Sequence, residues 1–153
     1  MKRFFSLGLI ATVLAAFAFT SCSKDDDDDS NGIVGKWELV SMKMEAGGMS
    51  MTFEGEDLDT DIMEFKSDGT CTSTSEEDGK TVVDKGKYSI SGDVLTVTDE
   101  EGTKESIKFS ISGNTLVLYQ EGYYDTLNDK IYEKQPEGED FPFVKMSMTY
   151  KRK

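Results

Sequence analysis

The sequence predicts an all-β domain, an antiparallel up-and-down barrel of eight strands, with a two-sheet β-sandwich as the alternative. Glycine turns recur every 9 to 13 residues from Gly69 to Gly122, a spacing typical of short antiparallel strands joined by tight turns. Between the turns, apolar residues such as Ile107, Phe109 and Ile111 alternate with polar ones, and this period of two indicates strands. A meander with one apolar face must close or stack to bury that face.

The expected strands begin near eight residues: Val34, Asp61, Thr70, Thr81, Val94, Lys104, Thr115 and Phe143. Two longer connections, 43–60 and 121–142, interrupt this rhythm. Connections of that length in a compact domain are usually lids, binding loops or disordered segments. Within the second connection, 124–133 is the stretch best suited to a short helix.

The first 21 residues have the pattern of a lipoprotein signal peptide. Lys2 and Arg3 precede an apolar stretch over 4–19, and Phe19-Thr20-Ser21-Cys22 has the form of a lipobox. Such a segment is removed before folding and is not a transmembrane helix. We expect the Cys22 thiol to carry the lipid that anchors the protein to the membrane. The predicted organisation is signal peptide 1–21, lipidated cysteine and acidic tether 22–32, and one domain 33–153.

Five consecutive aspartates, 25–29, follow the cysteine. Dense like charge prevents packing and predicts a solvated linker. The run also resembles the export signal of a large group of Gram-negative anaerobes, in which acidic residues after the lipidated cysteine send a lipoprotein to the outer cell surface. This resemblance implies an outer-membrane protein that is exposed on the cell.

Composition excludes several function classes. Loss of Lys2 and Arg3 takes the formal charge from −13 to −15, which argues against nucleic acid as a partner because phosphates need Lys and Arg. The chain has no histidine, so it lacks imidazole bases and the commonest metal ligand. Cys71 has no disulfide partner once Cys22 is lipidated, and its place in a strand indicates a buried structural thiol. We therefore expect no catalytic residues, no metal, no cofactor and no enzymatic activity.

An acidic run at Asp57-Leu58-Asp59-Thr60-Asp61 begins like a calcium loop. Ile62 stands where an EF-hand needs glycine, and Asp68 stands where it needs a bidentate glutamate. The run is therefore interpreted as an acidic surface loop.

Gly35-Lys36-Trp37 opens the first expected strand and contains the only tryptophan. This Gly-x-Trp resembles the first signature of the lipocalins and their lipocalin-like relatives. In that family an arginine from the far end of the domain stacks on the tryptophan and closes the base of the barrel, and Arg152 stands there, just beyond the last expected strand. The chain shows no Thr-Asp-Tyr signature and no segment for the helix after a full lipocalin barrel. The resemblance therefore implies the short lipocalin-like domain of bacterial lipoproteins, with Gly35, Trp37 and Arg152 in structural roles.

The same resemblance implies that the domain binds a small apolar or amphipathic ligand. Barrels of this size hold packed side chains or one small ligand. The candidate ligand-lining residues are Phe65, Tyr88, Ile90, Phe109 and Met146. The alternative is a surface interaction module, in which the long connections bind a glycan or a partner protein.

Each long connection carries a side-chain cluster with two interpretations. Around Gly47-Gly48 the cluster consists of Met42, Met44, Met49, Met51 and Phe53. These residues form a lid over a barrel mouth, or, as we favour, Met42 and Met44 extend the first strand while the others cap the core. The second connection carries Tyr123, Tyr124, Tyr132, Phe141 and Phe143. These aromatic rings bind a sugar or protein partner, or they fold back and seal the open end.

Overall fold

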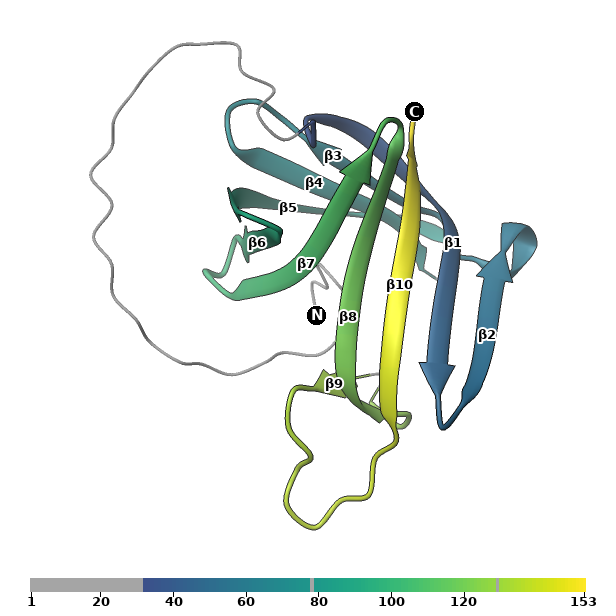
Figure 1. The fold of residues 1–153 in the computed structure, drawn as a ribbon. Coiled ribbons are helices and arrows are strands. Elements are labelled where there is room, and N and C mark those ends of the chain that lie inside the picture. The colour runs from purple at the N-terminus through teal and green to yellow at the C-terminus, as the bar shows by residue number, and fades with distance from the viewer. Residues whose placement is uncertain (1–31, 78, 129) are drawn as a thin grey trace.

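The computed structural model describes residues 32–77, 79–128 and 130–153. The predicted lipidation site Cys22, the predicted signal peptide 1–21 and the predicted acidic tether, apart from its last residue Gly32, lie outside these residues. The described chain consists of ten strands and one 3-10 turn (Figure 1). The elements are β1 (Gly35–Ala46), β2 (Met49–Glu54), η1 (Gly55–Asp57), β3 (Asp61–Phe65), β4 (Thr70–Glu77), β5 (Lys80–Ser91), β6 (Val94–Asp99), β7 (Lys104–Ser112), β8 (Thr115–Asp125), β9 (Lys130–Tyr132) and β10 (Phe143–Arg152). Within the described ranges, no helix is long and apolar enough to cross a bilayer.

Eight of the strands close into an antiparallel barrel. The ring runs β1-β3-β4-β5-β6-β7-β8-β10, and β10 pairs with both β8 and β1. Closure leaves no unpaired edge within the ring, which is how a barrel satisfies its backbone groups. The predicted eight-stranded barrel is confirmed, and the sandwich alternative is wrong. Six of the predicted strand starts coincide with the observed ones, and the first and fourth differ by one residue.

Two strands lie outside the ring, β2 beside β1 and β9 beside β8. The connection predicted over 43–60 is in large part a hairpin, because Gly47 and Gly48 both take positive φ (56° and 82°). Positive φ at both central residues matches the right-handed twist of the strands that a two-residue turn joins. The short helix expected within 124–133 is also wrong. The described residues there form the end of β8, a turn and β9.

The first strand changes phase near its middle. Its register against β10 shifts between Leu39 and Ser41, which makes Val40 an extra residue. Trp37 and Leu39 face the barrel interior before the bulge, and Met42 and Met44 face the same side after it. In Figure 1 the lower parts of β1, β8 and β10 continue past the ring, with β2 and β9 beside them. We call this five-stranded part the extension.

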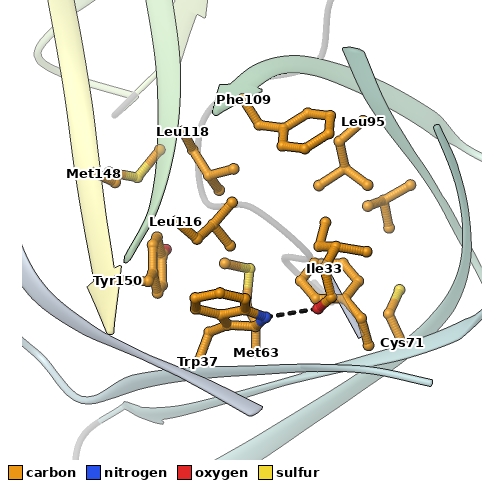
Figure 2. Packing of buried hydrophobic residues seen from close by; sticks show 12 residues of the cluster. Ile33, Trp37, Met63, Cys71, Leu95, Phe109, Leu116, Leu118, Met148 and Tyr150 are labelled. Carbon is orange, nitrogen blue, oxygen red and sulfur yellow. Dashed lines mark hydrogen bonds between the residues drawn. The ribbon is translucent and has the colours of Figure 1, made fainter. Parts of the chain in front are cut away.

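Two clusters of buried apolar side chains follow from this shape. The main cluster fills the barrel near the start of β1, and Trp37, Tyr150, Leu95, Leu116 and Leu118 are fully buried in it (Figure 2). Full burial of one such aliphatic side chain contributes about 1.5–3 kcal/mol. A second, smaller cluster lies in the extension and contains Ile131, Val144 and Met146.

Candidate functional site

One end of the barrel is closed by Trp37 and Arg152. The Arg152 Cζ atom lies 4.3 Å from the centroid of the Trp37 ring, within the range of a cation–π contact. The guanidinium also donates hydrogen bonds to the carbonyl oxygens of Val34 (2.7 Å) and Gly32 (2.5 Å). Trp37 Nε1 donates to the Ile33 carbonyl at 2.7 Å (Figure 2). The segment before β1 is therefore held across the barrel base by both side chains.

Gly35 completes this closure. Its φ is +135°, and a Cβ atom at this position would lie 2.5 Å from Arg152 Nη1. Any side chain here would displace the guanidinium and strain the backbone. The structure thus brings Gly35, Trp37 and Arg152 into one arrangement, and all three act on the shape of the barrel.

Four of the candidate ligand-lining residues belong to the main cluster. Phe65 and Phe109 are buried in it, and Tyr88 and Ile90 pack against it while partly exposed. The rings of Phe65 and Tyr88 meet edge to face, with centroids 5.1 Å apart. These four residues are thus occupied with core packing. Met146 is separate from them and belongs to the second cluster.

The extension gathers the methionine cluster expected around Gly47-Gly48 on one face of the sheet. Side chains that face each other across paired strands share one face of the sheet. The register gives three inward-facing rows, Phe53 with Met42 and Met148, Met51 with Met44 and Met146, and Met49 with Ala46 and Val144. We call Met42, Met44, Ala46, Met49, Met51 and Phe53 the methionine shelf. It continues the inner face of the barrel outward onto β2.

The rows are covered at one end and open at the other. Val144 and Met146 are 1% and 5% exposed, whereas Met51 and Met49 are 55% and 73% exposed. The cover on the buried side is Ile131 of β9, which packs against Val144 and Met146. Apolar surface is therefore presented to solvent along β2.

The structure corrects the interpretation of the methionines. Met42 and Met44 extend the first strand, as expected, and pack against the second cluster. Met49 and Met51 do not cap the core, because they lie on β2 with more than half of each side chain exposed. Period-two alternation of Met49, Met51 and Phe53 beyond a two-glycine turn is the signal that could have identified this strand.

The aromatic residues near β9 divide between two faces. Tyr124 packs against the second cluster, so it does contribute to sealing the extension. Tyr123 and Phe143 lie side by side on the opposite, outer face, with an edge-to-face contact of 5.4 Å. Tyr132 stacks on Phe141 at 5.9 Å. We call Tyr123 and Phe143 the outer aromatic group. Phe143 is 45% exposed, so part of this group is available to a partner.

Polar groups inside the barrel have perturbed acidities. Asp61 accepts hydrogen bonds from Tyr150 Oη (2.7 Å) and Ser73 Oγ (3.2 Å), and burial raises the pKa of its carboxyl. Burial, assisted by the charge of Asp99, raises the pKa of Glu105 to about 7. Burial also raises the pKa of the Cys71 thiol to about 11, so the thiol is protonated and unreactive at neutral pH. In the described part of the chain, no three acidic or cysteine side chains form a group able to hold a metal ion.

A family model described as "Lipocalin-like domain" matches residues 33–118, which include β1 to β7 and the start of β8. The chain belongs to this lipocalin-like family. Arg152, which closes the lipocalin-like barrel against Trp37, lies beyond the matched residues.

Two solved structures are similar to this lipocalin-like chain. A lipocalin-like protein from Bacteroides uniformis shares 17% identity, with a TM-score of 0.47, over 79% of this chain and 98% of that one. An uncharacterized protein from Bacteroides eggerthii shares 11% identity, with a TM-score of 0.46, over 79% of this chain and 99% of that one. No curated protein matches the chain.

Proposed function

We propose that this lipocalin-like domain is a binding protein without enzymatic activity and that it holds a small apolar or amphipathic molecule against the methionine shelf. The observation that carries the proposal is the register of β1, β2 and β10, which aligns the exposed Met49 and Met51 with the buried Val144 and Met146. A ligand laid along these rows covers apolar surface that is otherwise in water, and burial of such surface contributes about 25 cal/mol per Å².

Methionine suits this role for a physical reason. Its unbranched thioether side chain adapts to irregular apolar shapes, so a methionine surface accepts ligands of varied outline. The charge of the chain narrows the choice of ligand. A formal charge of −13 disfavours anionic amphiphiles by like-charge repulsion, so neutral or cationic molecules with an apolar body fit best.

The proposed location follows from the sequence outside the described residues. A lipid on Cys22 would hold the domain at the outer membrane, and the aspartates 25–29 would act as a tether at the cell surface. Metabolic labelling with an alkynyl fatty acid tests the anchor. The wild-type protein takes up the label, and Cys22→Ala does not. Equal labelling of the two proteins would contradict the lipid site.

Fluorescence of the lipophilic amine N-phenyl-1-naphthylamine tests the shelf. We expect enhancement with the wild-type protein and a Kd at least about tenfold higher for the double variant Met49→Ser, Met51→Ser, a loss of about 1.4 kcal/mol. Val83→Ser is the matched control, because Val83 is 52% exposed on β5, outside the shelf. Equal binding by the double variant and the control would contradict the proposal.

A second candidate function is recognition of a surface glycan or protein by the outer aromatic group. It is favoured by the exposure of Phe143 and by its contact with Tyr123, because exposed aromatic rings give large contact area at low entropic cost. A glycan-array experiment with wild type and Phe143→Ala tests it. Binding by the wild type that Phe143→Ala loses supports this function, and no binding by either protein contradicts glycan recognition.

A further inference from the structure

The strand β2 forms an open edge of the sheet. One side of Met49–Glu54 pairs with β1 from Ala46 to Ser41. Among the described residues, no strand pairs with its other side, and Figure 1 shows β2 at the outer margin of the extension. The backbone N–H and C=O groups on that side have no strand partner and can pair with another chain.

This edge has few of the features that usually prevent strand addition, and its one charged residue is Glu54 at its end. Native edge strands are protected by lysine, proline, bulges or very short length. The six residues of β2 include neither lysine nor proline, and their register with β1 is unbroken. All of them are exposed except Phe53, which is partly buried. The edge is therefore open to a partner along its whole length.

We propose that β2 accepts an additional strand from an extended polypeptide with apolar residues at alternate positions and basic residues between them. In such strand addition, main-chain hydrogen bonds give affinity and alternate side chains give specificity. An added strand would place every second side chain on the face that carries Met49, Met51 and Phe53. Apolar residues at those positions extend the methionine shelf by one strand.

Charge defines the remaining positions of the partner. Between Met49 and Phe65 the chain has six acidic residues and no Lys or Arg. Glu54, Glu56 and Asp57 are exposed where β2 ends and η1 begins. A basic strand is attracted to this edge, and an acidic strand is repelled.

The same charges argue against a second copy of this chain as the occupant. Two copies that paired through β2 would each carry a formal charge of −13 and would repel each other. The partner is therefore a different, basic polypeptide. This inference goes beyond the proposed function, because the small molecule uses the shelf face and the polypeptide uses the backbone of β2.

The probe is a short peptide of alternating valine and lysine, added to the full chain and followed by amide hydrogen exchange. Exchange at the β2 amides is expected to slow by about tenfold or more at saturating peptide. Two further peptides carry N-methyl groups on the odd or on the even residues. A strand offers its N–H groups alternately to its two sides, so one methylated peptide should bind and the other should not. Equal binding by both methylated peptides would overturn the proposal, because charge alone would then explain the affinity.

Variants give a second readout. Thr52→Lys places a positive charge in the middle of β2, as in protected edge strands, and should raise the Kd of the valine–lysine peptide at least about tenfold. Thr74→Lys is the control. It makes the same change in β4, which pairs with β3 and β5 on its two sides, and should leave the Kd of the peptide close to the wild-type value. Equal affinities of the two variants, or slow exchange at β2 in the protein alone caused by self-association, would contradict a basic partner strand. Naphthylamine binding by Thr52→Lys stays at the wild-type level, which separates this inference from the proposed function.

Discussion

Tyr150 on β10 donates a 2.7 Å hydrogen bond to Oδ2 of Asp61 on β3, across 89 residues of sequence. The two strands pair with opposite sides of β1, so the bond spans the strand at which the barrel closes. Tyr150 is fully buried, and a buried carboxyl without a donor would be costly. This pair therefore adds a polar constraint to a contact that is otherwise apolar.

Tyr150→Phe removes the donor and leaves Asp61 with Ser73 as its remaining side-chain partner. We expect the free energy of unfolding, measured by urea titration, to fall by about 1–3 kcal/mol. Tyr119→Phe is the control, since the Tyr119 hydroxyl meets Ser110 on the exposed outer face. Equal stability of the two variants would show that the buried pair contributes nothing to closure.

Arg152→Lys keeps the charge but loses the planar group that covers Trp37 and bonds two carbonyl oxygens. We expect a loss of about 1–3 kcal/mol in unfolding free energy, because lysine does not reproduce a stacked, forked contact. The only tryptophan of the chain should also show red-shifted emission as water reaches it. Lys151→Arg, the reciprocal change at an exposed neighbour, should leave both measurements unchanged. An unshifted spectrum in Arg152→Lys would contradict the role given to the guanidinium.

Gly122→Ala tests how β9 is seated on β8. A Cβ atom at Gly122 would lie 2.5 Å from both Ile131 Cγ2 and the Tyr132 carbonyl oxygen, so β9 has to move away. We expect the free energy of unfolding to fall by about 1–3 kcal/mol and the amide hydrogens of Lys130–Tyr132 to exchange faster. The neighbouring Glu121→Ala, whose side chain points outward, should change neither. Unchanged exchange in β9 would show that Gly122 is not required for the packing of β9 on β8.

Stability should depend on pH through Glu105. Its pKa is raised from 4.5 to about 7 in the folded state, first by burial and then by Asp99. The folded protein therefore binds the proton more tightly than the unfolded chain does. The resulting stabilisation is complete below about pH 4.5 and is lost as the pH rises through about 7.

Urea midpoints of wild type and Glu105→Gln, compared between pH 4.5 and 8, measure this effect. The difference in unfolding free energy between wild type and Glu105→Gln, obtained from these titrations, should change by about 1 kcal/mol over the interval. This value is reduced for solvent screening because the carboxyl is partly exposed. Glutamine cannot titrate, so the variant should lose this part of the pH dependence. Parallel curves for the two proteins would contradict a raised pKa. Asp61→Asn should likewise remove part of the pH dependence of stability, since burial also raises the pKa of Asp61.

The barrel strands were predictable because each carries regular alternation between glycine turns, and turn chemistry does not depend on distant residues. The exceptions have local causes. The bulge at Val40 shifts the phase of β1, so the end of this strand was not evident from alternation alone, although Met42 and Met44 were expected to extend it. β9 has only three residues, too few to show a period.

The candidate site was harder to predict than the fold. Phe65 and Met146 have the same apolar character in sequence, yet one fills the main cluster and the other supports the methionine shelf. The register of β3 against β1 decides this for Phe65, and the register of β10 against β1 decides it for Met146. Register is a long-range property that one sequence does not display. The exposure of Met49 and Met51 likewise depends on tertiary packing, because β9 covers Val144 and Met146 at the other end of the same rows.

The most direct test of the methionine shelf is an NMR titration of the protein with ¹³C-methyl methionine and N-phenyl-1-naphthylamine. We expect the methyl signals of Met44, Met49 and Met51 to shift in a saturable way. Met63, which is 3% exposed in the main cluster, should keep its position and serves as an internal control. A shift of Met63 while Met49 and Met51 remain unmoved would place the ligand inside the barrel and contradict the shelf as the binding site.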